Sequence, residues 1–303
     1  MVRSCSPRSS EADLRDTAAP LVDRPYGSRV DGRRSPSTRV RLVAVEGPSA
    51  TVREDRLATE EPLEIRVQTP SGASRVAVTM RTPGNDFELA AGFCFAEGMT
   101  GPDGIRRIRY CTDGLEQQFN VVTVDLDHEV PVGTVLERNF LTSSACGVCG
   151  TASIEALEAR GYQSVPDGAP LDRTVLWTLP ERLRTAQQVF ASTGGLHAAG
   201  LFTLDGELVC AREDVGRHNA LDKLVGWAVL GQRIPLTDHV LLVSGRTSYE
   251  LVQKALTAGV SHLVGISAPS SLAAGLAGRF GLSLVGFLRG TSCNVYSRPD
   301  RVR

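Results

Sequence analysis

The sequence contains almost no lysine. Of its 33 basic residues only Lys223 and Lys254 are lysines, and the other 31 are arginines. Such a bias over the whole chain is typical of genomic composition, and it does not locate a phosphate site. The formal net charge is only -1, because 34 acidic residues balance the basic ones. No overall basic field therefore points to nucleic acid as a partner.

Long apolar runs and abundant cysteine are also absent. No stretch reaches the roughly 18 apolar residues that indicate a membrane-spanning helix, and the N-terminus has no apolar core of signal-peptide length. The chain has 7 cysteines in 303 residues. An odd number of thinly spread cysteines is unlike a secreted disulfide framework. We therefore expect a cytoplasmic protein that does not bind membranes.

The composition changes along the chain and divides it into three parts. Residues 1–38 are rich in Ser, Pro, Asp and Arg and have no hydrophobic period, which predicts a disordered tail. Residues 39–140 carry several strand patterns and one helix pattern at 88–97, which predicts an N-terminal β-rich subdomain. Residues 141–303 predict an α/β subdomain that holds a CxxC loop and a ligand-binding edge.

The last third of the chain has the most regular pattern. Apolar runs at 240–243, 263–266 and 282–287 predict strands, and helix patterns separate them. Strands that alternate with helices form right-handed crossovers and parallel pairs. The Ser-rich turns 244–248 and 267–271 then lie together at the carboxyl edge of the sheet, where ligands of open α/β sheets bind.

These turns favour an anionic ligand. Each precedes a helix whose first N–H groups have no intrahelical partner and carry partial positive charge. Ser244 and Arg246 of the first turn add a small hydroxyl and a forked cation. The alternative is ordinary N-capping by Ser244, Thr247, Ser270 or Ser271. Neither GxGxxG nor GxxxxGK[ST] occurs, so no dinucleotide fingerprint or P-loop is predicted.

Two local patterns precede these turns. Residues 180–195 predict a helix that has Pro180 near its start and glycines at its end. Asp205-Gly206 stands between the apolar runs 201–204 and 207–210, which predicts a β-hairpin.

Two polar segments in the same region contain side chains that can bind anions or transfer protons. The segments are 193–197 and 212–218. Arg212 and Arg217 can bind phosphate, and His218 can carry a proton. The alternative is a hairpin end followed by an ordinary helix start.

The two closest cysteines stand in a loop of small residues. Cys146 and Cys149 lie in the segment SSACGVCG, just before a helix pattern that begins at Thr151. Such a pair can bind a soft metal, form a disulfide or carry sulfur on a thiolate. A structural zinc site needs four ligands, and no second CxxC pair is present. A thioredoxin-like redox role fits the motif but explains neither the length of the chain nor the anion-friendly turns.

Seven motifs occur in one order along the chain and carry a resemblance to a known family. They are MRTPGNDFELAAGFCFAEGM, SSACGVCG, TGGLHAAGLF, REDVGRHNALDK, SGRTSYELVQKALTAGV, SAPSSLAAGLA and GFLRGTSCNVYS. From about Val40 to Ser297 the sequence resembles the formate dehydrogenase accessory sulfurtransferase family, usually written FdhD.

The resemblance implies a sulfur carrier. Members of this family accept sulfane sulfur from a cysteine desulfurase as a cysteine persulfide. They pass it to the molybdenum cofactor, bis(molybdopterin guanine dinucleotide), before the cofactor enters formate dehydrogenase. The resemblance implies a cysteine desulfurase and formate dehydrogenase as partners, a homodimer, and GDP as a mimic of a cofactor fragment. It also implies an α/β fold with a cytidine deaminase-like core, a mixed sheet, and a parallel βαβαβ part at the C-terminal end.

The resemblance also assigns residues. It implies that Cys146 carries the persulfide and that Cys149 assists it, and no metal site is expected. The expected cofactor-binding residues are Phe287, Leu288, Arg289, Gly290, Thr291 and Ser292, together with Ser244 and Arg246 of the first turn. The alternative function is a non-catalytic chaperone of the molybdenum cofactor, which would keep its activity without the two cysteines.

Overall fold

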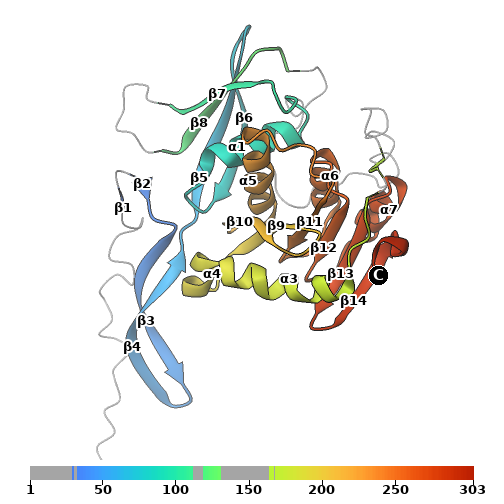
Figure 1. Cartoon of the computed structure of the whole chain (residues 1–303). Helices are drawn as coiled ribbons and strands as arrows, with labels where there is room; N and C mark the ends of the chain where they lie inside the picture. The colour runs from blue at the N-terminus through green and yellow to red at the C-terminus, as the bar shows by residue number, and fades with distance from the viewer. Residues whose placement is uncertain (1–28, 31–32, 112–118, 131–163, 167) are drawn as a thin grey trace, which may run out of the picture.

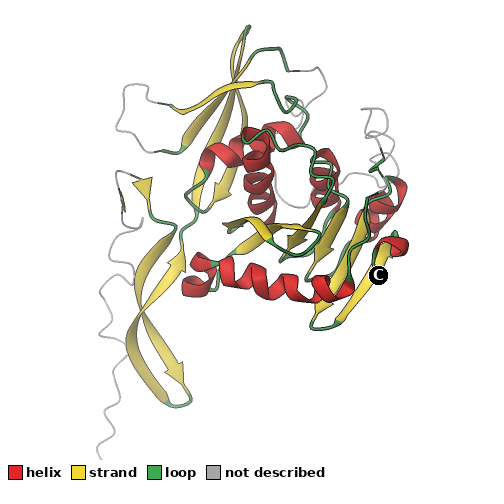
Figure 2. Ribbon diagram, in the orientation of Figure 1, coloured by secondary structure: helices red, strands yellow, loops and turns green. Residues whose placement is uncertain are grey.

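The computed structural model describes residues 29–30, 33–111, 119–130, 164–166 and 168–303 of the chain. These residues form a mixed α/β structure in which strand-rich N-terminal parts lie against a sheet covered by helices (Figures 1 and 2). Within the described residues, no helix is both long enough and apolar enough to cross a membrane.

A six-stranded mixed sheet forms the centre of the C-terminal region. Its strands follow the order β10-β9-β11-β12-β13-β14. Their bounds are β9 His197–Thr203, β10 Leu208–Asp214, β11 His239–Val243, β12 His262–Gly265, β13 Ser283–Arg289 and β14 Ser292–Ser297. Strands β11, β12 and β13 are parallel, and the other neighbours are antiparallel. The parallel βαβαβ part expected from the sequence is confirmed, and so is the hairpin between β9 and β10.

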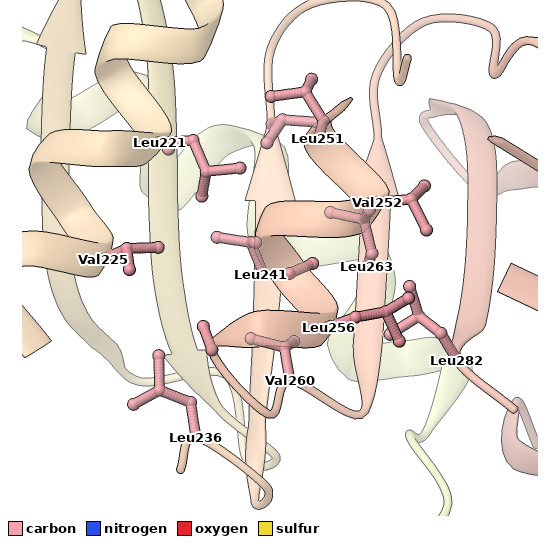
Figure 3. Close-up of a cluster of buried hydrophobic side chains, with 14 of the residues drawn as sticks. Leu221, Val225, Leu236, Leu241, Leu251, Val252, Leu256, Val260, Leu263 and Leu282 are labelled. Atoms are coloured by element: carbon pink, nitrogen blue, oxygen red, sulfur yellow. The ribbon is translucent and has the colours of Figure 1, made fainter. Parts of the chain in front are cut away.

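Helices cover both faces of this sheet. They are α3 Arg173–Ala186, α5 Arg217–Leu230, α6 Tyr249–Thr257 and α7 Ser271–Arg279, and the short helix α4 Gln188–Thr193 follows α3. In β11, Leu241 and Val243 join the core formed with α5, α6 and α7, whereas Val240 and Leu242 join the core formed with α3. Side chains alternate along a strand, so a strand with helices on both faces is apolar throughout. Figure 3 shows part of the first core.

The N-terminal region consists mainly of strands. A long hairpin, β3 and β4, is followed by a four-stranded sheet of order β6-β5-β8-β7. Their bounds are β3 Ser37–Glu46, β4 Ser49–Ala58, β5 Glu61–Thr69, β6 Gly72–Arg81, β7 Ile105–Tyr110 and β8 Val121–Leu126. Helix α1, Asp86–Ala96, packs on the four-stranded sheet with a separate apolar core that includes Leu63, Ile65 and Leu89.

Helix α1 joins the two regions. Its Leu89 and Cys94 belong to the core of the four-stranded sheet, whereas its Phe95 belongs to the core of the C-terminal region. The helix is apolar on nearly all sides because it lies between this sheet and α5 (Figure 1). The predicted boundary between residues 140 and 141 lies outside the described residues.

Both lysines of the chain are buried near this junction. The Lys223 ammonium is 2.7 Å from Asp214 Oδ2, and the Lys254 ammonium is 2.7 Å from Asp222 Oδ1. Both lysine side chains and both aspartates are less than a tenth exposed. Lysine, which is rare in this chain, therefore occurs in two buried ion pairs that involve α5 and α6.

Two boundaries differ from those that the sequence predicts. Helix α3 begins at Arg173 and not at Pro180, because Asp172 accepts a cap hydrogen bond from the Thr174 amide and Pro180 is tolerated inside the helix. The short strands β1 Arg29–Val30 and β2 Arg33–Arg34, and the start of β3, lie within the range predicted as a tail. Residues 1–28 lie outside the described residues.

Candidate functional site

The carboxyl ends of the three parallel strands meet at one edge of the six-stranded sheet. The turn after β11 pairs with the turn after β12: the Thr247 amide donates to Ala268 O at 3.1 Å, and the Ser270 amide donates to Thr247 O at 3.0 Å. The amide of Phe287, near the end of β13, donates to Ser267 O at 3.2 Å. The two Ser-rich turns and the end of β13 are thus held together by backbone hydrogen bonds.

The expected residues of the first turn have different surroundings. The Ser244 hydroxyl accepts a hydrogen bond from the Ala198 amide of β9 at 2.9 Å, so one lone pair is already used. Arg246 is exposed. Thr247 is buried, and its hydroxyl has no hydrogen bond in the structure.

Capping explains part of the serine content. Ser270 is the N-cap of α7, and its hydroxyl accepts from the Ala273 amide at 3.2 Å. Ser248 begins α6 without a side-chain cap bond, and its hydroxyl is 3.1 Å from His218 Nε2. The capping interpretation is therefore correct for the second turn, whereas Ser244 and Ser248 bond to residues of other elements.

The expected residues 287–292 form the hairpin between β13 and β14. Phe287 has a φ of 54° and is 38% exposed, which is an uncommon backbone conformation for a bulky residue. Arg289, Gly290, Thr291 and Ser292 are exposed. Leu288 is only 1% exposed and belongs to the core next to α3, so this expected binding residue is not accessible at the surface.

The segments 193–197 and 212–218 meet at the same edge. Strand β9 begins at His197 and β10 ends at Asp214, and these two residues are partners in the antiparallel register. Helix α5 then begins at Arg217, after the N-cap Gly216. Both polar segments are thus brought next to the turn after β11, which the sequence pattern by itself does not reveal.

Part of the segment 212–218 has a structural role. Arg212 forms two hydrogen bonds with the Glu88 carboxylate of α1, at 2.5 and 2.7 Å. Asp214 is fully buried and pairs with Lys223. Arg212, which the sequence offered as a phosphate ligand, is instead used to join α1 to β10.

The remaining residues of the segment face the edge. His197 Nδ1 and the Arg217 side chain both lie close to Gly245: a Cβ placed on Gly245 would be 3.3 Å from His197 Nδ1 and 3.4 Å from Arg217 Cδ. Burial lowers the pKa of His197, and the charges of Arg217 and His218 lower it further. His197 is therefore neutral at neutral pH.

His218 lies next to these groups but already has partners. Its Nε2 is 2.9 Å from Glu250 Oε2 and 3.1 Å from the Ser248 hydroxyl. The hydrogen bond from His218 lowers the pKa of Glu250, so this carboxylate is ionised at neutral pH. The pair links the starts of α5 and α6.

A cavity of about 620 Å³ opens beside this group of residues. His197, Ser244 and Ile266 line it from the sheet, and Gly195 lines it from the end of α4. The sequence marked the segment around His197 as functional, but only the fold shows that it borders a cavity with Ser244.

The expected sulfur-carrying residues, Cys146 and Cys149, lie outside the described residues. Burial raises the pKa of Cys94 to about 12 and that of Cys210 to about 11. Neither of these two cysteines forms a thiolate at neutral pH. No cluster of three or more His, Cys, Asp or Glu side chains that could hold a metal ion occurs in the part of the chain that the structure describes.

Comparison with known proteins identifies close relatives. Residues 58–303 match the FdhD/NarQ family. The chain is 48% identical to the Sulfur carrier protein FdhD of Mycolicibacterium paratuberculosis, over 88% of this chain and 98% of that protein. It is 50% identical to the protein of the same name from Streptomyces avermitilis, over 87% of this chain and 95% of that protein.

A solved structure shares the fold. The crystal structure of a putative formate dehydrogenase accessory protein from Desulfotalea psychrophila matches with a TM-score of 0.69 and 24% identity. The match covers 89% of this chain and 100% of that chain.

Proposed function

The chain belongs to the FdhD/NarQ family, and on this basis we propose that it is a sulfur carrier for the molybdenum cofactor of formate dehydrogenase. It accepts sulfane sulfur from a cysteine desulfurase as a persulfide on Cys146. It then transfers this sulfur to the bound cofactor, bis(molybdopterin guanine dinucleotide), which is its substrate. The observation that carries the proposal is the 48–50% identity to proteins named as sulfur carriers, over nearly the whole chain.

The loading step is a thiol exchange. The Cys146 thiolate attacks the terminal sulfur of the desulfurase persulfide, the S–S bond of the donor breaks, and the donor cysteine leaves as a thiolate. The sulfur keeps its oxidation state in this exchange. Its release as sulfide needs two electrons. The Cys149 thiolate, or an external thiol in its place, supplies them when it attacks the Cys146 sulfur, closes a disulfide and expels sulfide.

The carboxyl edge of the sheet supports the binding part of the proposal. The hairpin 287–292 offers the exposed side chains of Arg289 and Phe287 to a guanine nucleotide, and the turn of Ser244 and Arg246 lies two strands away along the same edge. The backbone of Phe287 is held in a sparsely populated conformation, a feature that occurs preferentially at ligand sites.

Mass analysis tests the sulfur-carrying part. We expect intact-mass analysis to detect one added sulfur atom after incubation with a cysteine desulfurase and cysteine. Peptide mapping should locate this sulfur on Cys146. Cys146→Ala should abolish formate dehydrogenase activation, and Cys149→Ala should reduce it less. Cys293→Ala is the matched control, since Cys293 is partly buried and burial raises its pKa.

The double variant separates the proposal from the chaperone alternative. Full activation of formate dehydrogenase by Cys146→Ala/Cys149→Ala would exclude sulfur transfer and leave a cofactor-binding chaperone. Calorimetry tests the ligand: GDP should bind more tightly than ADP, and Arg289→Ala should weaken GDP binding by about 1.5–3 kcal/mol through loss of a charged hydrogen bond.

A further inference from the structure

Besides the hydrogen bond from His218, the charge of Arg217 helps to lower the pKa of Glu250, but the Arg217 guanidinium has no direct carboxylate partner among the described residues. Its Nε atom is buried without a hydrogen bond, and no ion pair to its guanidinium occurs among the described residues. The other buried or half-buried cations of this region all have carboxylate partners: Arg81 with Asp86, Arg212 with Glu88, and Lys223 with Asp214. Partial burial of a cation without a partner costs free energy, so the exception requires a reason.

The nearby carboxylates are already used. Glu250 is 2.9 Å from His218 Nε2, and Asp214 is 2.7 Å from the Lys223 ammonium. The neutral ring of His197 cannot balance the charge of Arg217. Arg217 therefore adds a positive charge beside the turn at Gly245 that no ion pair balances among the described residues.

A glycine lets the side chains of His197 and Arg217 approach the backbone of the turn closely. Gly245 is buried, and a Cβ there would be 3.3 Å from His197 Nδ1 and 3.4 Å from Arg217 Cδ. The imidazole and the Arg217 side chain therefore lie close to the same point of the turn. His197 also lines the cavity of about 620 Å³, a space large enough for a ligand, whereas Arg217 is not among the lining residues.

We propose that Arg217 and His197 form an oxyanion subsite, separate from the hairpin 287–292, that holds a phosphate group of the ligand. The guanidinium fork matches the geometry of a phosphate and supplies the counter-charge. Neutral His197 adds a hydrogen bond without a competing charge. The identity of the ligand, a guanine nucleotide portion of the cofactor, rests on the proposed function, whereas the subsite itself rests on Arg217.

The position of the subsite fits a ligand with two recognised parts. Along the strand order β9-β11-β12-β13, the turn at Gly245 is two strands and His197 is three strands from the hairpin. Neighbouring strands lie about 4.8 Å apart, so the two sites are separated by roughly 10–14 Å along the edge. A nucleoside diphosphate can span this separation, with its base at the hairpin near Phe287 and its phosphates at Arg217.

Calorimetry with GDP, guanosine and inorganic pyrophosphate tests the subsite. The variants are Arg217→Gln, Arg217→Lys and the control Arg233→Gln. Arg233 lies just beyond the other end of α5, is exposed, and stacks on Trp227, so its replacement changes the net charge equally. We expect Arg217→Gln to weaken GDP and pyrophosphate binding about 10-fold to 100-fold, as for loss of a charged hydrogen bond. Arg217→Lys should retain part of the affinity, and guanosine binding should not change.

Thermal unfolding distinguishes ligand binding from a structural role. An uncompensated cation does not stabilise the fold, so the melting temperature of Arg217→Gln should be equal to or higher than that of the unmodified protein. A lower melting temperature, or GDP and pyrophosphate affinities unchanged from the unmodified protein, would overturn the subsite. The subsite would also be overturned if the unmodified protein bound neither GDP nor pyrophosphate.

Two further readouts separate the subsite from the proposed function. Pyrophosphate binding that depends on Arg217, without any binding of GDP, would support the subsite and refute the guanine ligand. Persulfide loading by the desulfurase should be the same in Arg217→Gln as in the unmodified protein. A simultaneous loss of loading would show that Arg217 acts in sulfur transfer and not as a separate anion subsite.

Discussion

Gly92 of α1 and Gly226 of α5 lie in direct backbone contact where the two helices cross. A Cβ built on Gly92 would be 1.9 Å from Asp222 O, and a Cβ built on Gly226 would be 1.8 Å from Glu88 O. Each Cβ would also be 2.8 Å from the amide nitrogen of the other glycine. The helices can approach this closely only because both positions lack a side chain. This contact joins the N-terminal sheet to the C-terminal region.

We expect Gly226→Ala to destabilise the protein strongly. The obstacle is a backbone carbonyl, so the helices must separate, and overpacking of this kind costs about 3 kcal/mol at the upper end of its usual range. Chemical denaturation measures the change. Gly275→Ala in α7 is the matched control, since Gly275 is exposed and has no neighbour within 4 Å. It should raise stability by about 0.5–1 kcal/mol. Equal behaviour of the two variants would contradict the close crossing.

The ion pair of Lys223 and Asp214 provides a second test of the same junction. Lys223→Met should cost about 3–5 kcal/mol, because the carboxylate of Asp214 stays buried without its counter-ion. Lys223→Met/Asp214→Asn should recover part of the loss, since no buried charge remains. Denaturation of the single and double variants gives the coupling energy. A double variant that is less stable than Lys223→Met would refute this explanation.

The fold should lose stability in acid through His262. Burial lowers the pKa of this histidine, the first residue of β12, to about 4, whereas its ordinary value is 6.5. The unfolded chain therefore takes up the proton first as the pH falls. The stabilisation is complete above about pH 6.5 and is lost towards pH 4, and the shift corresponds to about 3 kcal/mol.

His262→Asn should flatten the decline in stability between about pH 6.5 and pH 4 in denaturation experiments. His128→Asn is the control of opposite sign. The hydrogen bond to Asp127 raises the pKa of His128, so His128 adds stability in acid and its replacement should make the decline slightly steeper. An unaltered pH profile for His262→Asn would show that other groups cause the acid sensitivity.

Local sequence signals predicted the hairpin correctly, because a tight turn depends mainly on its own residues. The Asp205-Gly206 turn predicted the hairpin of β9 and β10, and Gly206 has the expected positive φ of 83°. Pro180 led to a wrong start for α3, because proline is typical of the first turn of a helix. The helix instead begins at Arg173, since burial of its apolar side chains favours a longer helix. Leu176, Leu179 and Leu183 form an apolar stripe that extends the helix on both sides of Pro180.

The roles of the two arginines in one motif could not be predicted. Arg212 and Arg217 stand five residues apart and were equivalent as phosphate ligands. The difference arises from Glu88, which is 124 residues distant from Arg212 in the sequence and meets it only because α1 packs on α5. No carboxylate forms an ion pair with Arg217 among the described residues, and its Nε has no hydrogen bond. Long-range packing therefore decides which of the two arginines pairs with a carboxylate.

Gly245 offers a test that changes the subsite without removing a charged group. Gly245→Ala should displace His197 and Arg217 by a few tenths of an ångström, since its Cβ would lie 3.3–3.4 Å from them. Both contacts are made by side chains, and the residue does not need a positive φ, so the fold should persist. Two groups that converge on one phosphate must be placed within about 0.5 Å. We therefore expect GDP binding to weaken about tenfold, or about 1.4 kcal/mol. Calorimetry and thermal unfolding measure both effects, with the exposed Gly278→Ala as the control. Unchanged GDP affinity in Gly245→Ala would show that no phosphate enters between His197 and Arg217.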